Sequence, residues 1–388
     1  MATLLLVYSL CYNPFVSASY VYAPLRISLE GIVLFLSLIF NIYYFNKNIF
    51  LWLAAITVLF SCFPLFDTDT AVHVVSSYNK MIFFILVVGL FYISDTMLLI
   101  SLKIWINLWR LLCCLAILAF IGYITGLIPF SLFELDVDAG APYTYMHNAI
   151  LGNIVPRFFY SIEYGRVAGF MYEPGLVGFF YGFNILVAKR WICDEKKARN
   201  FILLNFAAGL TSGSTSLIFF IVLFVFSSLI FGGNKHFIAI KVLLLAPFFV
   251  AIIFYILSSG LMEFTSSLER IARFQLGMEI LNNNTFITLL FGNGIGVSVK
   301  EGVGISSGPL NIFVERGAVM LSFIVFMFFK FSRYNKWLLF YLFYYSVMFE
   351  MFWFPLFLIG IAISYAQNNR HCYSENVCHQ LSTCRTSC

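Results

Sequence analysis

Charged residues are scarce in this chain. Only 11% of its residues are Asp, Glu, Lys or Arg, whereas 61% are hydrophobic, and the mean hydropathy is +0.92. A soluble domain has no use for so much apolar surface, because the interior of a protein grows only slowly relative to its surface. The composition therefore excludes an ordinary soluble protein and predicts an all-α polytopic membrane protein. Such a protein is surrounded by the lipid bilayer, and no nucleic-acid partner is expected.

Two sequence signals are also missing. No basic region precedes the first apolar run and no clear small-residue cleavage site follows it, so we expect no removable signal peptide. The cysteines of the segment 367–388 lack the paired two-residue gaps of ordinary zinc modules, which favours a disordered cytoplasmic tail over the alternative of a zinc site. No metal and no cofactor are expected. These tail cysteines are Cys372, Cys378, Cys384 and Cys388.

Long apolar runs fill most of the chain. A hydrocarbon core about 30 Å thick requires about 20 apolar residues per helix, and runs of this kind predict about twelve transmembrane helices. The predicted spans are 3–20, 28–45, 49–66, 81–100, 104–128, 167–188, 200–212, 215–232, 237–257, 307–329, 337–350 and 352–366.

Two stretches lack the apolar density of a span and are predicted to be long outer loops, 129–165 and 258–306. We expect them to close over one shared cavity, because they lie on either side of a central block of helices. The resulting divisions are N-terminal helices (1–128), the first loop, central helices (166–257), the second loop, C-terminal helices (307–366) and the tail.

Positive charge predicts the orientation in the membrane. Cytoplasmic loops carry the excess of Lys and Arg near the ends of spans. The strongest basic cluster lies within 189–199, and one alternation of spans places it inside together with Lys47, Lys103, Lys235, Lys241, Lys330, Arg333 and Lys336. Both termini are then cytoplasmic and both long loops are outside.

A first candidate site runs from Arg166 to Gly175, at the predicted outer end of the sixth span. Arg166 and Glu173 are seven residues apart, so a helix would place both on one face. A carboxylate inside a span is costly unless it is paired, hydrated or functional. Pro174 and Gly175 would loosen the helix beside it. The alternative interpretation is a buried structural ion pair.

A second candidate lies in the later loop, where Ser266–Glu269 has the pattern of a capping box that opens a helix. Arg270 and Arg273 follow three residues apart on one face, and two guanidinium groups so placed can grip a diphosphate. The alternative is an interfacial helix with snorkelling arginines. Its apolar side, expected to meet the membrane surface, consists of Leu268, Ile271, Ala272, Leu276, Ile280 and Leu281.

Other features are weaker. The alternate glycines of Phe291–Gly296 predict tight turns, but no Lys-Ser/Thr follows them, so a nucleotide-binding loop is not expected. Glu134, Asp136 and Asp138 resemble an incomplete calcium loop and are expected to be a solvated acidic run.

Charges also occur inside the predicted spans. Asp95 and Arg110 are predicted to pair across two adjacent helices, while Glu350 has no partner near it in sequence.

Taken together, these features resemble the bacterial O-antigen polymerase family of integral membrane glycosyltransferases. The resemblance rests on the number of spans, on the two outer loops and on two short stretches. The first stretch runs from Arg166 to Glu173-Pro174-Gly175. The second joins Phe291–Gly296 to Asn311-Ile312-Phe313-Val314-Glu315-Arg316-Gly317.

The resemblance implies that the protein lies in the inner membrane and polymerises O-antigen repeat units on its periplasmic side. A growing glycan on undecaprenyl diphosphate would move onto a new lipid-linked repeat, with release of undecaprenyl diphosphate. Control of chain length would need a partner protein. For binding of the diphosphate, the matching residues are Arg166, Arg270 and Arg273, with Arg157 as a weaker fourth. Glu173 is the first choice for the base and His147 the second. Glu315, Asn311 and Gly294 are expected to be supporting residues.

Two alternatives remain open. O-antigen ligases and other polysaccharide polymerases share the expected architecture, but Ser306-Ser307 stands where the ligase pattern has a His-Asn pair. A flippase or transporter of the same lipid-linked unit would also need many spans and a cationic cavity. The chain shows no internal repeat of the kind that transporters often have, which favours the polymerase.

Overall fold

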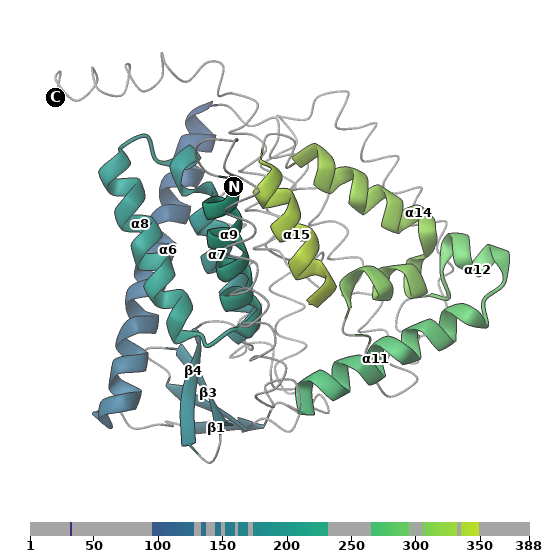
Figure 1. Cartoon of the computed structure of the whole chain (residues 1–388), viewed down its shortest axis with the longest axis horizontal. Helices are drawn as coiled ribbons and strands as arrows, with labels where there is room; N and C mark the ends of the chain where they lie inside the picture. The colour runs from purple at the N-terminus through teal and green to yellow at the C-terminus, as the bar shows by residue number, and fades with distance from the viewer. Residues whose placement is uncertain are drawn as a thin grey trace.

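The protein is described by a computed structural model whose helices and strands pack side by side (Figure 1). The structure describes Ile32 and residues 95–127, 133–136, 144–148, 152–159, 162–169, 174–231, 265–294, 297, 305, 307–331 and 335–348. Their elements are α6 (Asp95–Thr125), β1 (Phe133–Asp136), β2 (Thr144–Asn148), β3 (Gly152–Phe159), β4 (Ile162–Gly169), α7 (Pro174–Trp191), α8 (Glu195–Thr211), α9 (Thr215–Phe231), α11 (Thr265–Asn282), α12 (Phe286–Phe291), α14 (Gly308–Phe331) and α15 (Lys336–Met348).

Helices dominate, but the prediction of an all-α protein is wrong. A four-stranded antiparallel sheet in the order β1-β2-β3-β4 occupies most of the segment that was predicted to be the first long loop. Its inner residues are apolar on both faces, since the neighbours Ile154 and Val155 of β3 are both buried, as are Val167 and Ala168 of β4. The sequence signal was hidden because such strands lack a simple alternation of polar and apolar residues.

The sheet packs against the end of α6. A Cβ atom at Gly165 of β4 would lie 2.7 Å from the ring of Tyr123, so only glycine allows this close approach. The same contact explains why β4 continues past the predicted loop boundary to Gly169, because the strand is held between α6 and the start of α7.

The helix α6 corrects a second prediction. Two spans, 81–100 and 104–128, were expected with Lys103 in the loop between them, but α6 is continuous through Lys103. Nothing at positions 101–103 breaks a helix, because Ser, Leu and Lys are all tolerated there. Asp95 and Arg110 therefore lie on one helix and do not pair across a hairpin. The guanidinium of Arg110 lies 6.0 Å from the ring centroid of Phe201 in α8 instead.

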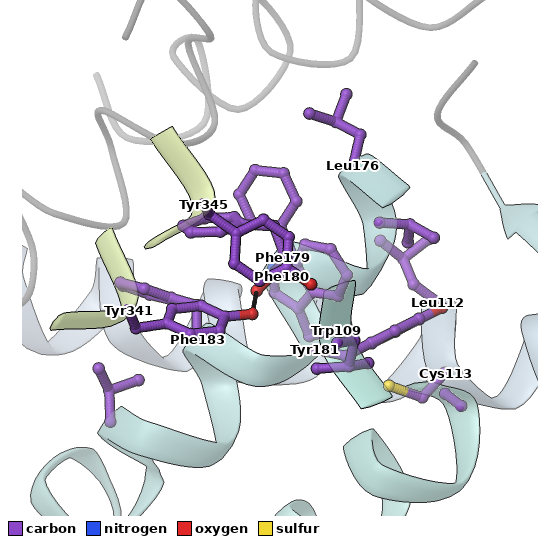
Figure 2. Close-up of a cluster of buried hydrophobic side chains, with 14 of the residues drawn as sticks. Trp109, Leu112, Cys113, Leu176, Phe179, Phe180, Tyr181, Phe183, Tyr341 and Tyr345 are labelled. Atoms are coloured by element: carbon purple, nitrogen blue, oxygen red, sulfur yellow. Dashed lines mark hydrogen bonds between the residues drawn. The ribbon is translucent and has the colours of Figure 1, made fainter. Parts of the chain in front are cut away.

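Aromatic rings form the core between α6, α7 and α15 (Figure 2). Trp109 of α6 stacks on Phe180 of α7 with a centroid distance of 5.2 Å, and Phe179 stacks on Tyr341 of α15 at the same distance. The Tyr341 hydroxyl also donates a hydrogen bond to the Phe179 carbonyl at 2.8 Å. Rings of this size bury large areas and favour stacked or edge-to-face contacts, so they fix the spacing of the three helices.

A chain of buried amides crosses the same bundle. Trp105 Nε1 donates to Asn184 Oδ1 at 2.8 Å, and Asn184 Nδ2 donates to Asn205 Oδ1 at 2.9 Å. Asn205 Nδ2 donates to the Phe201 carbonyl at 2.8 Å. Each of the three helices α6, α7 and α8 thus contributes one polar side chain, and every link has a partner, as burial of such groups requires.

Two helices in the described ranges are long and apolar enough to cross a membrane, Leu102–Thr125 and Gly308–Phe326. Twelve transmembrane helices are not supported by the described residues. Large apolar side chains are exposed along α6 and α8, among them Leu111, Leu118, Leu203, Phe206 and Leu210. The predicted spans 3–20, 49–66, 237–257 and 352–366, nearly all of 28–45, Glu350 and the cysteine-containing tail lie outside the described residues.

The two ends of the bundle differ in charge. Trp105 of α6 contacts Trp191 at the end of α7, with ring centroids 6.0 Å apart, whereas Tyr123 lies against the sheet. Lys103 and the basic residues of the α7–α8 turn therefore lie at the end of the bundle opposite to the sheet, as Figure 1 shows for the turn and the sheet.

Candidate functional site

The structure places Arg166 in a strand, which corrects the first candidate site. Arg166 lies in β4 and is half-buried, and α7 begins only at Pro174. The helical spacing that was expected to bring Arg166 and Glu173 onto one face is therefore wrong. Pro174 opens the helix rather than loosening it, because the first helical position needs no backbone N–H and suits the fixed φ of proline. Glu173 itself lies outside the described residues.

The strand register brings three of the predicted site positions to one face of the sheet. Position 166 pairs with 155, and His147 pairs with Asn153 across β2 and β3. Alternate residues of a strand share a face, so 153, 155 and 157 lie on the same side of β3. His147, Arg157 and Arg166 therefore occupy positions on one face, a juxtaposition that the sequence did not predict.

A second group of predicted residues meets where α12 contacts α14. The helix α14 is interrupted at Gly317, which has φ +75° and ψ 179°. This interruption deprives the carbonyl groups of Val314 and Glu315 of their normal partners one turn later in the helix. The turn after α12 supplies replacements: Asn293 N donates to Val314 O at 2.9 Å, and Gly294 N donates to Glu315 O at 3.0 Å. The tight turn predicted from the alternate glycines is confirmed at Gly292 and Gly294, where φ is +85° and +104°.

Two glycines make this contact reciprocal. A Cβ atom at Gly292 would overlap the Glu315 carbonyl oxygen, and one at Gly317 would overlap the Leu290 carbonyl oxygen. Both residues also have positive φ, a conformation that costs other residues energy. Asn293 adds a third bond, from its Nδ2 atom to Val314 O at 3.0 Å. The two stretches of the second motif, far apart in sequence, are thus joined backbone to backbone.

The interrupted helix carries buried charge. Glu315 and Arg316 are 8% and 3% exposed, and they directly precede Gly317 in a helix that is apolar enough to span a membrane. Charged residues at such positions are rare and usually functional. Asn311 lies one turn before Glu315 and is 5% exposed. The predicted supporting residues Gly294, Asn311 and Glu315 therefore lie in one site.

The helix α11 holds the second pair of arginines. The predicted helix is confirmed as α11, which begins at Thr265 and ends at Asn282, but the predicted cap Ser266 lies inside the helix and does not precede it. Both Arg270 and Arg273 lie in α11, and Arg273 is half-buried. The predicted apolar side is partly wrong, because Ile280 and Leu281 pack against α14 instead of facing outward. Phe274 and Met278 of this helix are exposed.

The site residues thus form two groups, one on the sheet and one around the interruption in α14. Figure 1 shows the sheet and the first turns of α11 toward the same end of the molecule. Asn293 and Arg316 were not among the predicted site residues. An asparagine between two glycines after a helix is a turn signal that identifies Asn293. Arg316 belongs to the second stretch of the resemblance, but no local pattern predicted its burial, because burial depends on packing.

Comparisons of the chain with protein-family models, with curated proteins and with solved structures give no match.

Proposed function

We propose that this protein is a membrane glycosyltransferase that polymerises lipid-linked oligosaccharide repeats, as O-antigen polymerases do. The observation that carries the proposal is the interruption of the apolar helix α14 beside buried Glu315 and Arg316, where the glycine turn bonds to the carbonyl groups of Val314 and Glu315. Irregular backbone at membrane depth is tolerated where it is buried in protein or lines a cavity, and polar substrates use such places.

The proposed enzyme lies in the bacterial inner membrane, with about twelve spans and both termini in the cytoplasm, as the apolar runs and basic clusters of the sequence predict. Exposed apolar side chains on α6 and α8 suit contact with lipid tails. Basic residues at the end of the bundle opposite to the sheet suit the cytoplasmic side. The sheet and the first turns of α11 would then lie at the periplasmic face.

The proposed reaction is an attack by a sugar hydroxyl of a new lipid-linked repeat on the anomeric carbon of the growing glycan. The bond from that carbon to the diphosphate oxygen breaks, and undecaprenyl diphosphate leaves with the electron pair. Arg157, Arg166, Arg270 and Arg273 would bind the diphosphate and neutralise its charge, which stabilises the transition state. Glu173, or His147 in its place, would accept the proton of the attacking hydroxyl.

A lipopolysaccharide gel tests this proposal. A strain that lacks the gene should attach a single repeat to the lipid core, and the wild-type chain should restore the ladder of longer glycans. Arg166→Ala, Arg270→Ala and Glu173→Gln should reach the membrane, as an immunoblot would verify, but should not restore the ladder. Arg199→Ala is the matched control, because Arg199 is exposed at the opposite end of the bundle and should leave the ladder normal.

Two results would contradict the proposal. Loss of even the single repeat in the deletion strain would indicate a ligase or a flippase rather than a polymerase. A normal ladder with all three site variants would show that the arginines and the glutamate are not the residues that bind and activate the substrates.

A further inference from the structure

The first half of α14 carries a buried polar stripe. Ser307, Asn311 and Glu315 follow one another at intervals of four residues, so they lie along one side of the helix. All three are buried, with 7%, 5% and 8% of their surfaces exposed. Ser307 has a structural role at the start of α14, since its carbonyl accepts the Asn311 N–H at 2.8 Å. Asn311 and Glu315 lie inside the helix, where no cap requires them, and buried polar groups require partners.

The stripe does not face α11. Leu310 and Val314 form the contact with that helix, together with Ile280 and Leu281. Asn311 and Glu315 each follow one of these contact residues, so they lie about 100° further round the α14 axis. The stripe therefore flanks the α11 contact and leads along the helix toward the interruption at Gly317.

Asn311 has an acceptor that the described part of the chain does not use. Its Oδ1 atom is shielded from solvent and has no hydrogen-bond partner there. An amide oxygen accepts and never donates, so the missing partner must bring an O–H or N–H group. Native proteins seldom leave such an acceptor unpaired, and a bound molecule is one way to satisfy it.

A cationic residue lies near the same end of α14. A Cβ atom at Gly277 of α11 would lie 2.7 Å from Leu310, so this face of α11 is turned toward α14. Arg273 is one turn before Gly277 and therefore lies on the same face, nearer to the start of α14 where the stripe begins. A guanidinium suits a phosphate, whereas the Asn311 amide oxygen can accept a hydrogen bond from a hydroxyl group.

We propose that Asn311, flanked by Ser307 and Glu315, accepts a hydrogen bond from a hydroxyl group of the sugar that carries the diphosphate. The inference rests on the proposed function and deepens it, because it assigns to this stripe the recognition of the repeat's sugar. Asn311 is then a residue that determines specificity, and the arginines retain the diphosphate.

The test uses the full-length protein in lipid nanodiscs and the lipid-linked repeat isolated from a strain that lacks the gene. Asn311→Leu keeps the size of the side chain and removes its acceptor. We expect it to raise the KM for the repeat roughly 3- to 10-fold, as loss of one hydrogen bond predicts, with kcat little changed. Asn283→Leu is the matched control, since Asn283 is exposed at the end of α11 and should leave KM unchanged.

A purely structural role gives the opposite result. Asn311→Leu also removes Nδ2, so a structural role would change the melting temperature alone and would leave the KM for the repeat as in the wild type. That result would overturn the inference. Asn311→Ser, which is too short to reach the same hydroxyl, should show the same rise in KM and serves if the leucine variant does not fold. A wild-type protein that forms no polymer in this assay would instead refute the proposed function itself.

Discussion

The contact between Gly317 and α12 should make this position intolerant of any side chain. In Gly317→Ala the new Cβ atom would overlap the Leu290 carbonyl and would lie 2.5 Å from Phe291 N, both of which are backbone atoms that cannot rotate away. The combination of φ +75° and ψ 179° is open almost only to glycine, so it adds strain of roughly 1–3 kcal/mol for a residue with a Cβ atom.

Relief of this overlap requires α12 to move away from α14. The movement would weaken the hydrogen bonds from Asn293 N and Gly294 N to α14, each worth about 1 kcal/mol net. The sum predicts a loss of roughly 3–5 kcal/mol in the free energy of unfolding. Thermal unfolding of the detergent-purified protein, followed by circular dichroism, measures the loss.

A matched control separates strain from overlap. Gly126 has φ +65°, but a Cβ atom there would meet nothing within 4 Å. Gly126→Ala should therefore carry only the backbone strain, roughly 1–2 kcal/mol. Equal losses of stability in Gly126→Ala and Gly317→Ala would refute the reasoning, because they would show that the approach of α12 to α14 contributes nothing.

Two further predictions concern the bundle. Asn184→Leu should lower the unfolding free energy by about 2–4 kcal/mol, because it leaves Trp105 Nε1 and Asn205 Oδ1 buried without partners. The control is Asn200→Leu, on the exposed side of α8, and equal melting temperatures of the two variants would contradict the prediction. The Lys197 backbone N–H, which bonds to the Asp194 carboxylate, lowers the pKa of Asp194. The stabilising effect of this hydrogen bond is therefore present above about pH 4 and is lost as the pH falls through the lowered pKa of Asp194. The wild type should then lose more thermal stability on acidification than Asp194→Asn. Parallel losses in the two proteins would exclude this contribution.

Local patterns predicted several elements well. The apolar runs 215–232, 307–329 and 337–350 correspond closely to α9, α14 and α15. The pattern from Ser266 to Glu269 indicated the helix α11, although not its cap, and the alternate glycines located the turn at Gly292 and Gly294. Each of these signals acts over one helical turn or one β-turn, so neighbouring residues are sufficient to specify it.

Long-range contacts explain the failures. The strands of the sheet are specified by pairing with one another and by the support of α6 at Gly165, neither of which leaves a local pattern. Arg166 was assigned to a helix for the same reason, because the apolar run after it continues into α7. The juxtaposition of His147, Arg157 and Arg166 follows from strand register, which depends on partners that a single strand does not reveal.

The amino-acid sequence by itself determined that helices predominate among the described residues, that basic residues gather around the turn between α7 and α8, and that glycines mark a tight turn. Composition and short-range stereochemistry are sufficient for these conclusions. Only the tertiary structure decided that the glycine turn completes the hydrogen bonds of an interrupted α14, and that Asn311, Glu315 and Arg316 are buried beside it. The physical reason is that burial and the pairing of backbone groups depend on segments distant in sequence, whose approach no local pattern encodes.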